Sequence, residues 1–128
     1  MLTSQRSHIL AIIHISDFYL LDAPIALHGL SYGTPAIGDL ERKPTRSDTK
    51  FLVTLNHTIH FHRLDGWRAD GPDGGVYVEL KSPWAKGGRV LGHSKIFGRD
   101  GAVVATCVQE SYILLRSHEE TTERKAKL

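Results

Sequence analysis

The sequence predicts an α+β domain in which one long helix is followed by an antiparallel β-sheet that wraps it. Two observations support this fold class. In the first segment, apolar residues recur at helical spacing, at Ile9, Ile12, Ile13, Leu20 and Leu21. Four strand-like runs rich in Val, Ile, Thr and aromatic residues then fill most of the chain from residue 50 to 116, and Gly-containing turns separate them.

The composition fits a single domain of this kind. The chain has 128 residues, of which 41% are hydrophobic and 23% are charged, with a formal net charge of +2, as in ordinary globular proteins. This weak charge gives no reason to expect nucleic acid as a partner, although a slightly basic surface favours a polyanionic ligand. One cysteine, Cys107, excludes an intrachain disulfide. His14 and Asp17 interrupt the first apolar run, so we expect a soluble protein without a signal peptide or membrane span.

The helix is predicted from Ser4 to Leu21. Thr3 and Ser4 are possible N-caps because their hydroxyls can accept a backbone hydrogen bond. Pro24 is expected to end the helix, since proline has no N–H and its ring clashes with the preceding turn. Residues 24–50 are rich in Gly, Pro, Thr and Ser, and we interpret them as an irregular connection.

The strands are predicted at residues 50–63, 74–83, 89–99 and 102–116. Asp100-Gly101 is a strong hairpin signal between the last two strands, and the short connections predict an antiparallel meander. A long helix wrapped by such a sheet is the plan of a hotdog fold. We therefore place a hotdog domain at residues 1–116 and a charged tail at residues 117–128.

The stretch "TLNHTIHFHR" (residues 54–63) holds three histidines and invites a metal-site interpretation. Side chains alternate along a strand, so His60 and His62 share one face and His57 lies on the other. Two ligands are fewer than the three or four of a zinc site, and we therefore predict no metal. His57 should be a buried imidazole with a hydrogen-bond partner. Alternation also puts Thr54 opposite the apolar face, so either the polar face lines a functional site or a bulge intervenes.

Two polar residues fall where apolar ones are expected. Asp17 lies along the helix stripe predicted to face the sheet, where a desolvated carboxyl group can serve as a general base. Gln109 lies inside the apolar run "VVATCVQESYILL" and needs hydrogen-bond partners if it is buried. The alternatives are an Asp17 solvated at the helix edge and a Gln109 on the solvated face of an edge strand. Cys107 lacks a basic neighbour that would make it a nucleophile.

Three segments resemble, in order and spacing, the C-terminal half of the type II acyl-CoA thioesterases, a double-hotdog family. They are "ISDFYLLDAPIALHG", "TLNHTIHFHR" and "SPWAKGGRVLGHSKIFGRDGAVVATCVQES". The resemblance implies hydrolysis of acyl-CoA to free fatty acid and CoA by an activated water, without a cofactor. It also implies that Asp17, Thr54 and Gln109 surround that water. The histidine stretch would then serve mainly to deliver Thr54.

The same resemblance raises the question of a partner. Family members carry two hotdog repeats, so this single hotdog, which looks shortened at its N-terminus, is expected to form a homodimer or to pair with another hotdog. The tripeptide Ala126-Lys127-Leu128 is similar to a peroxisomal address, which predicts a peroxisomal protein, with the cytoplasm as the alternative. Two other functions stay open: a repurposed hotdog lyase or isomerase acting on a polyketide-like substrate, and a non-catalytic fragment or assembly module.

Overall fold

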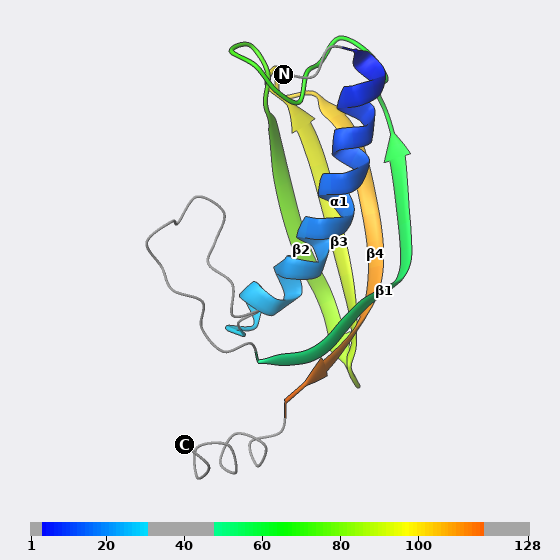
Figure 1. Cartoon of the computed structure of the whole chain (residues 1–128), viewed down its shortest axis with the longest axis vertical. Helices are drawn as coiled ribbons and strands as arrows, with labels where there is room; N and C mark the ends of the chain where they lie inside the picture. The colour runs from blue at the N-terminus through cyan, green and yellow to red at the C-terminus, as the bar shows by residue number, and fades with distance from the viewer. Residues whose placement is uncertain (1–3, 31–47, 117–128) are drawn as a thin grey trace.

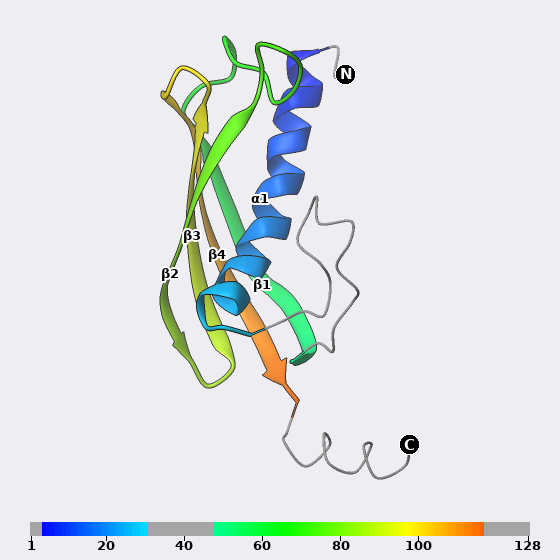
Figure 2. The same cartoon turned by 90° about the vertical axis from the view of Figure 1, so that its left-hand side faces the viewer.

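The computed structural model of the chain describes residues 4–30 and 48–116 (Figure 1). Its elements are α1 (Gln5–Leu27), β1 (Thr49–Phe61), β2 (Val76–Lys86), β3 (Arg89–Gly98) and β4 (Val103–Leu115). The strands form one antiparallel sheet, and α1 lies along one face of it (Figure 2). The α+β prediction is confirmed. The predicted tail at 117–128, with its C-terminal tripeptide, lies outside the described residues, as do Thr3 and residues 31–47 of the predicted connection.

Helix α1 begins where it was predicted and ends later. The Ser4 hydroxyl accepts a hydrogen bond from the Ser7 N–H at 3.2 Å, so Ser4 is the N-cap. The expected end at Pro24 is wrong, because Pro24 lies inside the helix and its carbonyl still accepts from His28 N–H at 3.2 Å. A proline in the last turn removes one donor without preventing the next turn. The helix ends instead at Leu27, and Gly29, with φ +69°, donates its N–H to the Ala26 carbonyl oxygen of the last turn at 3.1 Å.

The sheet order is β1-β4-β3-β2, which corrects the predicted meander. Strands β2, β3 and β4 do follow one another as neighbours, but β1 pairs with β4 rather than with β2. The reason is the connection at residues 62–75, which is long enough to carry the chain from one edge of the sheet to the other. Trp67 in this connection is only 6% exposed and joins the core under α1.

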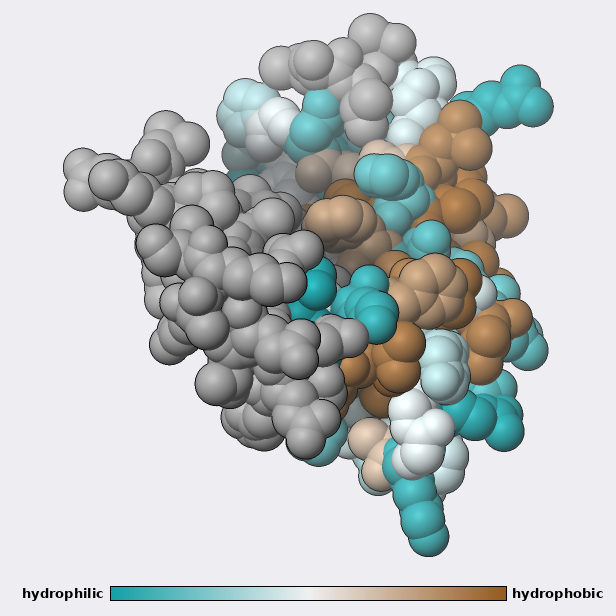
Figure 3. All heavy atoms as spheres, turned by 60° about the horizontal axis from the view of Figure 1, so that its bottom comes forward, coloured by the Kyte–Doolittle hydropathy of each residue, from teal (hydrophilic) through white to brown (hydrophobic). Residues whose placement is uncertain are grey.

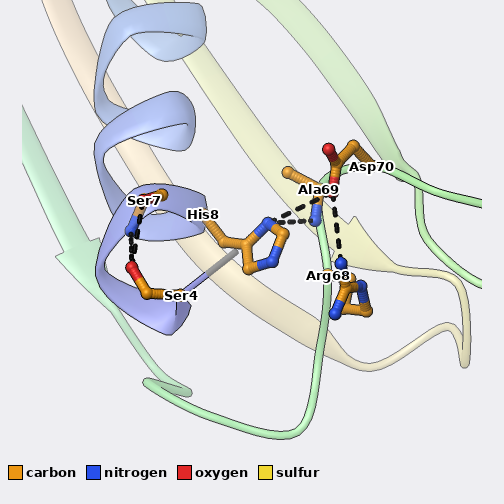
Figure 4. A network of polar contacts seen from close by, with 6 residues as sticks. All are labelled: Ser4, Ser7, His8, Arg68, Ala69 and Asp70. Carbon is orange, nitrogen blue, oxygen red and sulfur yellow. Dashed lines mark hydrogen bonds and ion pairs between the residues drawn. The ribbon is translucent and has the colours of Figure 1, made fainter. Parts of the chain in front are cut away.

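A buried histidine ties this connection to the start of α1. His8 is 2% exposed, and its Nδ1 accepts a hydrogen bond from Ala69 N–H at 3.2 Å. Asp70 Oδ1 lies 3.7 Å from the same nitrogen, and the Trp67 ring lies against the imidazole at a centroid distance of 6.2 Å. Figure 4 shows the imidazole pointing from the helix to the loop. The N-terminal half of α1 is thereby fixed over the sheet.

The core lies between α1 and the sheet in two clusters. The larger contains the buried residues Ile12, Leu20, Trp67, Ile96, Val104, Ala105 and Cys107. The smaller lies at the C-terminal end of α1 and contains Ile25, Val90 and Ile113. Beside the smaller cluster is an apolar cavity of about 730 Å³, lined among others by Pro24, Leu30, Val90 and Leu114. Figure 3 shows that apolar residues reach the surface at this end of the molecule. Among the residues that the structure describes, no helix is long and apolar enough to cross a bilayer.

A β-bulge in β1 changes which side chains face the helix. The pairing of β1 with β4 shifts between Thr54 and Asn56, and the extra residue, Leu55, is 52% exposed. After a bulge, strand alternation resumes with the opposite parity. Thr54 before the bulge and His57 after it therefore both point to α1. The bulge therefore explains how Thr54 faces the helix although simple alternation puts it on the opposite face.

Candidate active site

The three residues predicted to surround a water meet in one hydrogen-bonded cluster. Thr54 Oγ1 donates to Asp17 Oδ1 at 3.0 Å. Gln109 Nε2 donates to the same carboxylate oxygen at 2.5 Å and to Thr54 Oγ1 at 2.9 Å. Asp17 comes from the middle of α1, Thr54 from β1 and Gln109 from β4, so the cluster exists only in the folded chain.

A glycine in β3 lets α1 approach the sheet at this point. Gly92 is the register partner of Gln109 across β3 and β4. A Cβ atom at Gly92 would lie 3.1 Å from Leu20 Cδ2 and 3.5 Å from the Leu20 carbonyl oxygen. Leu20 is 1% exposed and lies one helical turn after Asp17. The missing side chain therefore allows the close packing that brings Asp17 within reach of Gln109.

Gln109 is buried as predicted, whereas Asp17 is exposed. Gln109 is 1% exposed on the central strand β4, so its burial is confirmed and the solvated edge-strand alternative is wrong. Asp17 is exposed in the single chain, as in the alternative of an Asp solvated at the helix edge, and its expected place on the buried stripe is wrong. The buried stripe of α1 runs through Ile12, Ser16 and Leu20, and Asp17 lies on its flank. The carboxylate therefore combines two fixed donors with access to solvent.

A count of donors and acceptors shows what the cluster can hold. Gln109 uses both N–H groups, and its Nε2 also lies 3.4 Å from the Asp17 carbonyl oxygen. Thr54 uses its one hydrogen, and both bonds to the Asp17 carboxylate end on Oδ1. Among the described residues, Asp17 Oδ2 accepts no hydrogen bond, and the buried Gln109 Oε1 has no partner. A buried amide oxygen without a partner is costly. The acceptor that the cluster presents to solvent is therefore the carboxylate of Asp17, which suits a water molecule that donates a hydrogen.

The histidines of β1 have separate partners rather than a common one. His57 Nε2 lies 3.1 Å from Ser16 Oγ, which confirms the expected partner, although the His57 side chain is half-buried rather than buried. His62 Nε2 lies 2.9 Å from Thr106 Oγ1, and His60 is exposed. Within residues 4–30 and 48–116, no three His, Cys, Asp or Glu side chains converge as metal ligands would.

Sequence reasoning missed Ser16 and Gly92. Ser16 lies four residues after Ile12 and four before Leu20, a spacing that places it on the buried stripe and was a usable signal. For Gly92 the sequence offered no signal beyond the glycine itself inside a strand pattern. Cys107 is buried, and this burial raises the pKa of its thiol. It is therefore unsuited to act as a nucleophile, as predicted.

A long helix against an antiparallel sheet, with Asp, Thr and Gln joined where they meet, defines a hotdog domain with a candidate hydrolytic site. Residues 3–113 match the family model described as acyl-CoA thioesterase C-terminal domain, and the chain belongs to that family. The predicted family resemblance and the hotdog fold are both confirmed.

Individual relatives agree with this assignment. Acyl-coenzyme A thioesterase 8 of Rattus norvegicus is 30% identical over 123 residues, which make up 94% of this chain and 31% of that protein. The protein of the same name from Mus musculus is 29% identical over 114 residues, 87% of this chain and 28% of that protein. The crystal structure of acyl-CoA thioesterase II TesB2 from Mycobacterium marinum is 31% identical, with a TM-score of 0.60 over 87% of this chain and 36% of that one. The chain thus spans about a third of the length of these relatives.

Proposed function

We propose that this chain provides the water-activating half of an acyl-CoA thioesterase, which hydrolyses acyl-CoA to free fatty acid and CoA. The observation that carries the proposal is the cluster of Asp17, Thr54 and Gln109, in a chain that belongs to the acyl-CoA thioesterase C-terminal domain family. A carboxylate held by two donors and open to solvent is suited to act as a general base.

The proposed reaction uses water as the nucleophile. The water donates one hydrogen to Asp17 Oδ2, and an oxygen lone pair is left for the thioester carbonyl. Asp17 accepts the proton as the water oxygen bonds to the carbonyl carbon. The C–S bond then breaks, and the proton passes from Asp17 to the departing CoA thiolate. Thr54 and the Gln109 amide hold the carboxylate in place throughout.

The test is the release of CoA thiol from a panel of acyl-CoAs, compared between the wild type and Asp17→Asn. The amide cannot accept the proton, so we expect the rate to fall by about 100-fold or more. In heavy-oxygen water, hydrolysis must place the label in the product acid, whereas a lyase or isomerase leaves the acid unlabelled. Asp65→Asn, at an exposed position in the connection between β1 and β2, is the matched control. A folded wild-type chain that releases no thiol would exclude the proposal.

The acyl part of the substrate needs an apolar environment. The cavity of about 730 Å³ at the end of α1 supports this role, because ligand pockets typically measure about 300 to 1,000 Å³. Its lining is largely apolar and includes Pro24, which lies about two turns after Asp17 on the same helix. We assign the acyl chain to this cavity.

We assign the remaining part of the site to a second hotdog, supplied by a second copy of the chain. The exposure of Asp17 supports this assignment, because a base that faces bulk water lacks the enclosed setting in which electrostatic interactions are strong. Size-exclusion chromatography with light scattering measures the mass directly, and a monomer that binds no acyl-CoA would contradict the assignment.

For localisation we propose that Ala126-Lys127-Leu128 directs the protein to the peroxisome. The test is the distribution of a fluorescent fusion that leaves this tripeptide at the C-terminus, compared with one that lacks it. Cytoplasmic fluorescence from both fusions would exclude the proposal.

A further inference from the structure

Two consecutive residues of α1 make polar contacts with β1. Asp17 accepts a hydrogen bond from Thr54, and Ser16 Oγ lies 3.1 Å from His57 Nε2. In a regular strand, residues three apart point to opposite faces. Thr54 and His57 would therefore face opposite sides of β1, but the bulge at Leu55 turns both toward α1, so both contacts form together. The helix and the strand are therefore joined at two adjacent points, one of them inside the candidate active site.

The donors in this region fix the direction of the second contact. Ser16 Oγ donates its hydrogen to the Ile13 carbonyl oxygen at 2.9 Å. A hydroxyl group has one hydrogen, so the hydrogen between Ser16 and His57 must belong to the imidazole. His57 therefore donates from Nε2, and in its neutral form it is the Nε2–H tautomer. Ser16 is 1% exposed, so without the imidazole its oxygen would keep the bond to Ile13 but lose the His57 donor in a buried place.

His57 also borders the third residue of the site. It is the register partner of Gln109 across β1 and β4, and both side chains contact α1. Directly opposed residues in an antiparallel pair have Cβ atoms about 5 Å apart. The imidazole is therefore the neighbour of the amide that holds Asp17, on the side away from Gly92.

We propose that Ser16 and His57 form a positioning pair, which sets the register of α1 against β1 and so holds Asp17 at Thr54 and Gln109. The proposal rests on the proposed function, in which Asp17 is the general base. Neither member of the pair touches the reacting water. Their effect is on geometry, and a displacement of about 1 Å in a catalytic group can lower a rate by about 100-fold.

The kinetic test is a double-mutant cycle on thioester hydrolysis. Ser16→Ala removes the acceptor and His57→Phe removes the donor, and each is expected to lower kcat by about 10- to 100-fold with KM nearly unchanged. Because the two residues act as one unit, the double variant should be no slower than either single variant. His57→Gln keeps an N–H donor and should recover much of the rate. His60→Phe, at an exposed position of the same strand, is the matched control.

Two kinetic outcomes would overturn the proposal. One is a wild-type kcat in Ser16→Ala, and the other is a double variant whose loss equals the product of the two single losses. Thermal unfolding shows whether each variant is folded. Ser16→Ala removes a single oxygen atom and is the deciding variant if His57→Phe does not fold.

A second measurement does not depend on hydrolysis. Long-range ¹H–¹⁵N NMR of the imidazoles should show His57 as the Nε2–H tautomer. Ser16→Ala should shift the side-chain amide signals of Gln109, and His60→Phe should leave them unchanged. An Nδ1–H tautomer, or unshifted Gln109 signals in Ser16→Ala, would overturn the positioning pair. If the wild type does not hydrolyse thioesters while both NMR results hold, the proposed function fails and the structural coupling of the pair to Gln109 stands.

Discussion

Thr54 both gives and receives a hydrogen bond within the candidate site. Its hydroxyl donates to Asp17 Oδ1 and accepts from Gln109 Nε2. Valine has the same shape without the hydroxyl, so Thr54→Val would leave one Gln109 N–H only the longer contact with the Asp17 carbonyl oxygen, at 3.4 Å. It would also remove one of the two donors to the carboxylate. Serine keeps the hydroxyl and loses only a methyl group.

We expect Thr54→Val to lower kcat for thioester hydrolysis by about 10- to 100-fold, because two bonds that orient Asp17 and Gln109 are lost together. Thr54→Ser should stay close to the wild type. Steady-state assays of thiol release measure both variants, and Thr58→Val, at an exposed position on β1, is the control. A rate in Thr54→Val equal to that of Thr54→Ser would show that the hydroxyl has no catalytic role.

Cys107 gives the folded chain a pH-dependent stability. Burial raises the pKa of its thiol, because the thiolate is poorly solvated in the core. In the unfolded chain the pKa of the thiol is about 8.5. The stability that comes from the protonated buried thiol is therefore fully present below about pH 8.5 and is lost as the pH rises through the folded-state pKa.

Urea unfolding at a series of pH values tests this linkage. The free energy of unfolding of the wild type should fall more steeply above about pH 8.5 than that of Cys107→Ala, which has no thiol to titrate. The Ala variant also serves as the control for lysine and tyrosine residues, which titrate in both proteins. Parallel pH profiles for the two proteins would contradict the expectation.

At the scale of the elements, the site depends on how closely α1 lies over the sheet. Gly92 in β3 permits this contact, since a Cβ there would lie 3.1 Å from the buried Leu20 Cδ2. Gly92→Ala should therefore push α1 away from β3, at a cost of about 1–3 kcal/mol in stability. Because Asp17 is one turn before Leu20, we also expect kcat to fall by more than this loss of stability explains.

Denaturant unfolding and thiol-release assays on Gly92→Ala measure the two effects. Leu20→Ala combined with Gly92→Ala offers a second readout, because a smaller residue at position 20 makes room for the new methyl group. Partial recovery of kcat in the double variant would support the packing argument. An unchanged rate in Gly92→Ala would show that the approach of the helix does not control the site.

The features that could be predicted from the sequence are those that depend on residues close together in the chain. The N-cap at Ser4 and the turn at Asp100-Gly101 depend on neighbouring residues, so local patterns reveal them. Asp17 and Gln109 stood out because a polar group in an apolar pattern needs a partner. The position of β1 beside β4 depends on contacts far apart in the sequence, which local patterns do not specify.

The bulge at Leu55 is a second feature that depends on a distant part of the chain and not on neighbouring residues. Alternation predicted the inward face correctly after the bulge, at His57, but not before it, where Leu52 and Thr54 face the helix. Nothing in "TLNHT" marks where the parity changes. The change is visible only in the pairing with β4. Without it, the contacts of Thr54 and His57 with α1 could not both form.

At the scale of the whole molecule, the candidate base lies on an apolar surface that faces solvent. Leu10 and Ile13 occupy the same exposed side of α1 as Asp17, about two turns and one turn before it, and they are 59% and 39% exposed. Exposed apolar side chains beside a functional group are typical of a surface that is covered by a partner. The proposed second copy of the chain would cover Asp17 and exclude bulk water from it.

Ile13→Glu tests this arrangement at one point. A carboxylate buried without a partner is strongly unfavourable, so we expect the variant to shift toward monomer in light scattering and to lose thioester hydrolysis in parallel. Leu64→Glu, on the connection between β1 and β2, introduces the same charge at a residue that is 60% exposed, and it should change neither property. If Ile13→Glu stays dimeric and fully active, the copies associate through another surface and Asp17 acts without a cover. If it becomes monomeric and stays active, one hotdog suffices for the reaction, and the need for a second copy is refuted while the roles of Asp17, Thr54 and Gln109 are retained.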